Sequence, residues 1–229
     1  MNDNYLLIAV LILFFVMTVR GYHKGFLRIA ITFIGMIIIL MAVKYATPYV
    51  NDYLINHTDT YNKIQEKITE TFEESNSKYD NTVKENQQLT IEEYDVPDIL
   101  KEVLIENNTE EMYKTLLATI FEEYISAFLA KKAVNAISFV FLFVIFIVAF
   151  KVVLGAADII AKVPIIKGIN KTAGALVGII ESVLITWVFF FFVMIFVGDD
   201  FGVSLLSMIS ESKFLSLLFN TNFLFKIFG

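Results

Sequence analysis

Long apolar segments alternate with one long polar segment along the chain. Four apolar runs stand out, at residues 5–19, 29–43, 133–154 and 173–197. A helix rises about 1.5 Å per residue and needs about 20 apolar residues to cross a bilayer, so the first run lies at the short end of the spanning range. The pattern predicts an all-α integral membrane protein with four transmembrane helices, arranged as two hairpins on either side of the polar segment.

The first two runs are close enough in sequence to form a helical hairpin. Their connection, residues 20–25, contains Gly21 and Gly25, which permit a sharp turn. A secretory signal peptide fits this region poorly, because the chain begins Met-Asn-Asp-Asn and its positive charges follow the apolar run instead of preceding it. We therefore expect an anchor that stays in the membrane.

The polar segment has the spacing of helices rather than of a low-complexity linker. Apolar side chains recur every three or four positions at Tyr61, Ile64, Ile68 and Phe72. Pro97 is placed to open a second short helix. Asn108 and Glu111 have the spacing that predicts a capping box, and no helix breaker follows before the third apolar run. We therefore expect one long helix from about Thr109 into the bilayer.

The segment after Gly198 is amphipathic. Serines alternate there with the apolar residues Leu205, Leu206, Ile209, Leu217 and Leu218. Glu211 and Lys213 interrupt the run, so we expect a C-terminal helix in the membrane interface rather than a fifth span. The chain thus divides into a first transmembrane hairpin (1–47), an acidic helical module (48–130), a second transmembrane hairpin (131–198) and an interfacial tail (199–229).

Charge is distributed unevenly over these segments. The formal net charge is −6, but residues 49–130 contain 18 acidic residues and 6 lysines, while the rest of the chain contains 6 acidic and 12 basic residues. A basic remainder beside apolar segments is typical of membrane topology signals rather than of nucleic-acid binding. We therefore expect the lipid bilayer as a partner, and no nucleic acid.

Orientation follows from the basic residues of the two short connections. Arg20, Lys24 and Arg28 lie in the first, and Lys162, Lys167 and Lys171 lie in the second. With four helices both connections fall on the same side, which the positive-inside rule makes cytoplasmic. We predict a multi-pass protein of the plasma membrane, with both termini and residues 48–130 extracytoplasmic.

Two sequence motifs in these connections resemble those of the colicin V production protein family (CvpA-like). The loop at residues 20–26 is similar to the R-G-x-x-x-G-h loop of that family, and residues 163–178 resemble its second signature, a proline-containing loop that leads into a glycine-spaced helix. The residues that carry the resemblance are Arg20, Gly21, Lys24, Gly25, Arg28, Pro164, Gly168, Asn170 and Lys171.

The resemblance covers roughly residues 1–48 and 130–200. It implies a bacterial inner-membrane protein that is linked to toxin production or export and to envelope homeostasis. The chain departs from the compact members of the family, because a segment of nearly ninety residues, acidic in its net charge, lies between its second and third apolar runs. We interpret these residues as an inserted extracytoplasmic module, about which the resemblance implies nothing.

Small residues form a stripe on the fourth apolar run. Gly174, Gly178, Ser182 and Thr186 are spaced by four, which places them on one face of a helix. Small residues let helix backbones approach closely within a membrane. We consider two interpretations of this packing face, contact between subunits of a homo-oligomer and contact within one chain.

Glu181 is the only charge in the fourth run and lies about two turns inside it. A charge near the middle of a bilayer costs at least about 2.5 kcal/mol on insertion scales, so such residues often mark function. Lys151, near the end of the third run, is within reach of the same level. Two hypotheses stand, a buried Glu181–Lys151 pair or polar pathway, and a water-facing Glu181 with a snorkelling Lys151.

Residue types exclude several kinds of site. The chain has no cysteine, and its only histidines are His23 and His57, so thiolate and His-rich metal sites are excluded. No nucleophile–base motif or phosphate-binding glycine loop occurs. We expect no catalytic residue, no metal, no cofactor and no enzymatic activity.

Three hypotheses for function remain. The preferred one is a non-enzymatic inner-membrane protein that supports toxin production or export, or envelope homeostasis. The second is an oligomeric channel or transporter subunit, in which Glu181 would line a wet interface. The third is a membrane-tethered sensor or adaptor, in which residues 48–130 bind an envelope or secretion protein.

Overall fold

The computed structural model describes residues 4–73, 81–157 and 169–228, and within these ranges every regular element is a helix. Four of the helices are long and apolar enough to cross a membrane: α1 (Tyr5–Lys24), α2 (Phe26–Asn56), α7 (Phe121–Ala157) and α8 (Ile169–Ile195). This confirms the prediction of an all-α protein with four candidate transmembrane helices.

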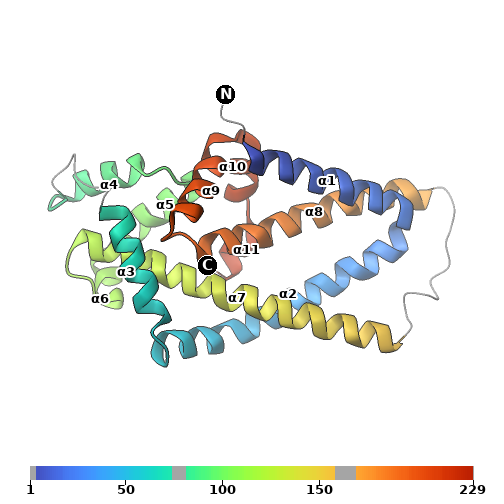
Figure 1. The fold of residues 1–229 in the computed structure, drawn as a ribbon, viewed down its shortest axis with the longest axis horizontal. Coiled ribbons are helices and arrows are strands. Elements are labelled where there is room, and N and C mark those ends of the chain that lie inside the picture. Colours follow the sequence, from blue (N-terminus) through green and yellow to red (C-terminus); the bar gives the residue numbers. More distant parts are fainter. Residues whose placement is uncertain (1–3, 74–80, 158–168, 229) are drawn as a thin grey trace.

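The four long helices pack mainly as two pairs. Helix α1 packs along α8, and α2 packs along α7 (Figure 1). The α1–α2 junction, the end of α7 and the start of α8 all lie at one end of the molecule, and the polar module lies at the other. Both basic connections are therefore attached to the same end of the bundle.

Gly25 makes the turn between α1 and α2. Its φ is 78°, a left-handed conformation that a residue with a Cβ rarely adopts, and its amide donates to the carbonyl of Gly21 at 2.9 Å. The predicted glycine turn is thus confirmed at Gly25. Gly21 lies inside α1, where it serves packing instead.

The module consists of α3 (Thr60–Glu73), α4 (Lys84–Glu93), α5 (Asp98–Asn107) and α6 (Glu110–Leu116), gathered around the first turns of α7. Ile68 and Phe72, two residues of the predicted apolar stripe, are buried. The hydroxyl of the fully buried Tyr124, on α7, donates to the carbonyl of Leu104, on α5, at 2.6 Å. The module and α7 therefore share one core.

The predicted continuous helix from Thr109 into the bilayer is wrong. Thr109 caps α6 by accepting from the amide of Met112. Helix α6 ends at Leu116, and the next residue, Leu117, has a left-handed backbone with φ 56°. The amide and hydroxyl of Thr119 then donate to the carboxylate of Glu123 at 2.7 and 2.8 Å. This second cap starts α7 afresh at Phe121.

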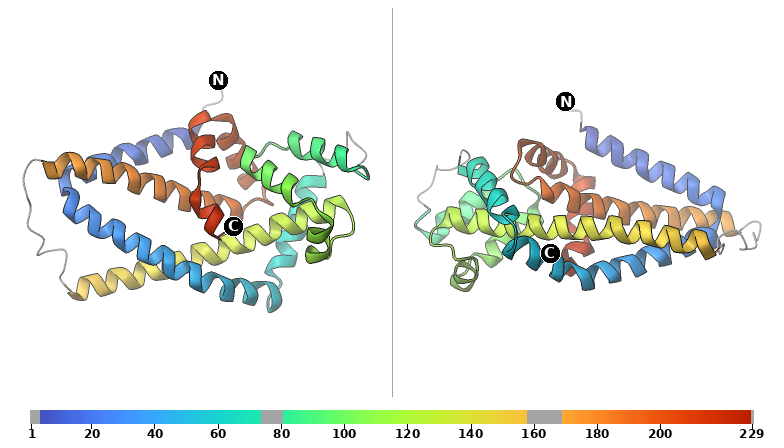
Figure 2. Two further views of the ribbon diagram at one scale, coloured as in Figure 1. Left: turned by 180° about the vertical axis from the view of Figure 1, so that it is seen from behind. Right: turned by 60° about the horizontal axis from the view of Figure 1, so that its bottom comes forward.

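The C-terminal tail is three short helices rather than one. Helices α9 (Asp200–Glu211), α10 (Lys213–Asn220) and α11 (Phe223–Phe228) lie between the α1–α8 pair and the module (Figure 2). The segments 200–211 and 213–225 are apolar enough to count together as a span, but they bend by 104°. Their apolar faces are buried through Leu206, Ile209, Leu215, Leu218 and Phe219. Placement of the tail in the membrane interface stays a prediction.

Candidate functional site

The predicted small-residue stripe lies in the α1–α8 interface. A Cβ on Gly174 would overlap the backbone of Gly21, and a Cβ on Gly178 would overlap the carbonyl of Met17. Ser182 and Thr186 continue the same face and are fully buried, with their hydroxyls donating to carbonyls of α8 itself. The stripe is therefore used for packing within one chain.

An ion pair crosses this interface. Arg20 Nη1, in the last turns of α1, lies 3.5 Å from Glu181 Oε1 on α8. The Glu181 side chain is 6% exposed and the Arg20 side chain is 35% exposed. The pair therefore has one buried partner and one partner that reaches toward the end of the bundle.

The second oxygen of Glu181 is unpartnered. Oε2 is buried and accepts no hydrogen bond from any residue that the structure describes. A buried polar atom without a hydrogen-bond partner is costly, and such atoms are uncommon in folded proteins. Glu181 thus contributes one oxygen to the ion pair with Arg20 and leaves the other oxygen without a partner among the described residues.

The hypothesis that pairs Glu181 with Lys151 is not supported. Lys151 is exposed on α7, whereas α8 packs mainly against α1 at the level of Glu181. Arg20 takes the place of Lys151 because close glycine packing holds the last turns of α1 against α8. The sequence pattern assigned Arg20 to membrane topology and to the family-like loop, and it missed this ion pair.

The two basic connections meet at the same end of the bundle. Lys171 Nζ, at the start of α8, lies 5.4 Å from the ring centroid of Tyr22 in α1. Lys24, in the last turn of α1, is exposed. Pro164 and Gly168 lie outside the described residues, as do the side chains of Arg28 and Asn170. The family-like residues that the structure describes therefore gather around the Gly21–Gly174 contact.

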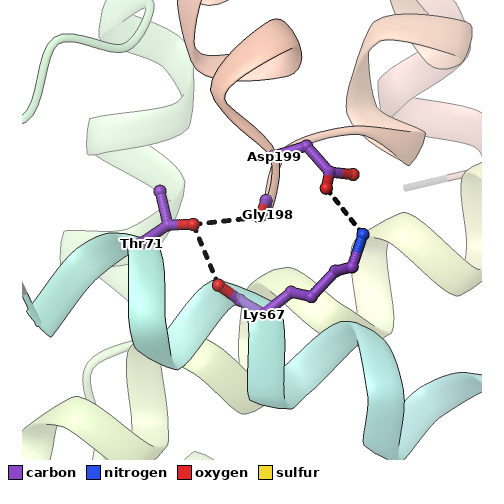
Figure 3. Close-up of polar contacts among 4 residues, drawn as sticks. All are labelled: Lys67, Thr71, Gly198 and Asp199. Atoms are coloured by element: carbon purple, nitrogen blue, oxygen red, sulfur yellow. Dashed lines mark hydrogen bonds and ion pairs between the residues drawn. The ribbon is translucent and has the colours of Figure 1, made fainter.

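A second polar cluster fastens the module to the bundle (Figure 3). Lys67 Nζ on α3 lies 2.6 Å from Asp199 Oδ1 in the turn between α8 and α9. Thr71 Oγ1 lies 2.9 Å from the carbonyl oxygens of both Lys67 and Gly198. The hydrogen bond to Asp199, followed by the charge of that residue, raises the pKa of Lys67. This fastening cluster was not predicted, because its members are far apart in sequence.

Glycine permits the close approach of α3 to this turn. A Cβ on Gly198 would lie 2.7 Å from the side chain of Ile68 and 3.1 Å from its backbone nitrogen. Within the described ranges, no group of three or more Asp, Glu or His residues is arranged to hold a metal ion. The structural chemistry of both clusters is therefore that of charge pairing and packing.

These features define a protein with four candidate membrane spans, in which α8 carries a buried acid and packs through glycines against α1. Residues 112–222 match the family model described as Colicin V production protein, so this part of the chain is similar to that family. The match runs from α6 to the end of α10. The resemblance of the first hairpin lies outside the matched residues and stays a prediction. Searches of curated proteins and of solved structures found no match.

Proposed function

We propose that the protein is a non-enzymatic inner-membrane protein of the colicin V production type, which supports toxin production or export, or envelope homeostasis. The observation that carries this proposal is the family match over residues 112–222, which includes the whole of α8 with Gly174, Gly178 and Glu181. The α1–α8 interface, with its buried Glu181, is the part of the molecule that this function would depend on.

In the proposed orientation, the end of the bundle that bears Tyr22, Lys24 and Lys171 faces the cytoplasm. Support comes from the excess of basic residues at this end and from the acidic character of the module at the other. The module and both termini are then extracytoplasmic.

A membrane-tethered sensor or adaptor is the second candidate, and one observation favours it. Helix α7 runs without a break from the module into the bundle, and the Lys67–Asp199 pair joins the module to the end of α8 as well. A partner that binds only one conformation of the module would also favour one arrangement of the membrane helices, because α7 and the Lys67–Asp199 pair connect the two parts. A flexible tether would transmit no such bias.

A complementation experiment tests both candidates. A host strain that lacks the gene would be scored for toxin export and for detergent sensitivity, and then complemented with the wild type or with variants. We expect the wild type to restore the phenotype and Gly174→Leu to fail. Absence of any phenotype in the deleted strain would contradict the first proposal.

Variants of the fastening cluster separate the two candidates. Lys67→Met together with Thr71→Val removes the contacts to Asp199 and Gly198, and Lys63→Met, on an exposed position of α3, is the matched control. The adaptor hypothesis predicts loss of complementation by the double variant alone, at an unchanged level of inserted protein. Full complementation by the double variant would contradict it.

A further inference from the structure

A polar cavity of about 220 Å³ lies where the module meets α2 and α7. Three amide side chains line it, from Asn51, Asn107 and Asn135. Two adjacent lysines, Lys131 and Lys132, complete its polar wall. No carboxylate is among the lining residues, so the cavity is basic although the module around it is acidic.

The two lysines have no acidic partner. In the part of the chain that the structure describes, neither Lys131 nor Lys132 has a carboxylate within ion-pair distance. Lys132 is half-buried, with its Nζ 5.2 Å from the ring centroid of Phe128, and Lys131 is exposed at the cavity edge. Two adjacent uncompensated cations favour an anion between them.

The amide groups of the wall are held in place by a network. Asn51 Nδ2 lies 3.5 Å from Asn135 Oδ1, and the Ser138 hydroxyl donates to Asn51 Oδ1 at 3.3 Å. Asn135 Nδ2 donates to the carbonyl of Phe228. These contacts tie α2, α7 and α11 together, so the wall is preformed rather than assembled around a ligand.

The cavity lies at the level of a membrane boundary. The apolar run of α7 begins at Ala133, directly after the two lysines. On α2, the exposed Tyr45, Tyr49 and Tyr53 lie on the face opposite Asn51, in the last turns of the helix. Tyrosines are enriched where helices leave a membrane. Lipid headgroups occupy this level of a bilayer.

An apolar cavity of about 70 Å³ adjoins the polar one and shares Lys132 and Asn135 with it. Its remaining wall is apolar and includes Leu100, Val103 and Phe191. It is under half the size of the cavity of about 150 Å³ that admits benzene, so it takes only a short apolar group. The two cavities together therefore suit an anionic head group, in the polar cavity, that is followed by a short apolar group, in the apolar cavity.

We propose that the polar cavity binds a phosphate-bearing anion between Lys131 and Lys132, and that an anionic phospholipid headgroup supplies it. The phosphate accepts hydrogen bonds from the two ammonium groups at the cavity mouth. The start of the lipid's apolar part enters the neighbouring cavity. The lipid then bridges α7 and the module, at the point where the chain leaves the membrane.

Lipid titration of the full-length protein in detergent tests this proposal. Bound lipid is counted by native mass spectrometry while phosphatidylglycerol, phosphatidylcholine or inorganic phosphate is added. We expect phosphatidylglycerol to bind, and Lys131→Gln with Lys132→Gln to weaken it about thirtyfold, the loss typical of two lysines near an anionic surface. Lys63→Gln with Lys114→Gln removes the same charge from exposed positions outside the cavity and should leave binding unchanged.

A second variant keeps the test decisive if the lysine variant fails to fold. Met112→Glu places a carboxylate of similar length in the cavity wall and should abolish the bound lipid. Equal weakening by the cavity and control variants, or none by either, would overturn the proposed site. Lysine-dependent binding of inorganic phosphate as tight as that of phosphatidylglycerol would overturn the lipid as its occupant.

Discussion

Gly21 and Gly174 pack backbone against backbone where α1 leaves the bundle and α8 enters it. The Cβ of any larger residue at either position would overlap the main chain of the other helix. A neighbouring side chain can rotate away from such a clash, but a helix backbone cannot move without separating the pair. This contact also holds Arg20 within reach of Glu181.

Gly174→Leu should separate α1 from α8. We expect a loss of about 1–3 kcal/mol in the free energy of unfolding, the usual range for forced overpacking, together with loss of the Arg20–Glu181 contact. Thermal unfolding in detergent measures the effect. Thr172→Leu, at an exposed position two residues earlier, is the control and should unfold like the wild type. If Gly174→Leu and Thr172→Leu were equally stable, the close contact between α1 and α8 at Gly174 would be contradicted.

Arg20→Gln should destabilise the bundle more than Lys151→Gln. Removing Arg20 leaves the buried Glu181 without its cation, while Lys151 is exposed. Because Arg20 is partly exposed, we expect a modest cost of about 1–2 kcal/mol, most of which should be recovered in the double variant with Glu181→Gln. A double-mutant cycle measures this coupling. Coupling of Glu181 to Lys151, with none to Arg20, would contradict the ion pair described here.

Tyrosines in the module should respond differently to loss of their hydroxyls. Tyr94 and Tyr113 have buried hydroxyls without a hydrogen-bond partner among the described residues, whereas Tyr124 donates to the carbonyl of Leu104. We expect Tyr94→Phe and Tyr113→Phe to be neutral or to stabilise by up to about 1 kcal/mol, and Tyr124→Phe to cost about 1 kcal/mol. Chemical unfolding of each variant tests this order, and the reverse order would refute it.

Alkaline pH should loosen the module. Burial, and secondarily the charge of Glu122, raises the pKa of Tyr113 to about 12 and that of Tyr94 further. In the unfolded chain a tyrosine ionises near its ordinary pKa of about 10. In the folded protein, Tyr94 and Tyr113 therefore stay protonated to a higher pH than in the unfolded chain. The contribution of these groups to stability is complete below pH 10 and is lost as pH rises through the folded pKa. Unfolding titrations between neutral and alkaline pH should show this loss in the wild type and a smaller one in Tyr113→Phe.

Hydropathy and spacing predicted much of this molecule, because they depend on single helices. The four spans follow from apolar runs, and the close-packing face of α8 follows from Gly174 and Gly178 at a spacing of four. The partner of Glu181 did not follow, since Arg20 and Lys151 both lie near the same end of the bundle and only the packing order of the helices decides between them. The break at Leu117 carries no Gly or Asn signal, so the pattern gave no sign of it.

The most direct test of this account is cysteine accessibility in spheroplasts, since the sequence contains no cysteine of its own. Single substitutions His23→Cys, at the α1–α2 end, and Gln88→Cys, on the exposed face of α4, would be labelled with an impermeant maleimide. We predict labelling of Gln88→Cys in intact spheroplasts and of His23→Cys only after permeabilisation. Labelling of His23→Cys alone in intact spheroplasts would invert the protein, place the module in the cytoplasm and contradict the proposed orientation.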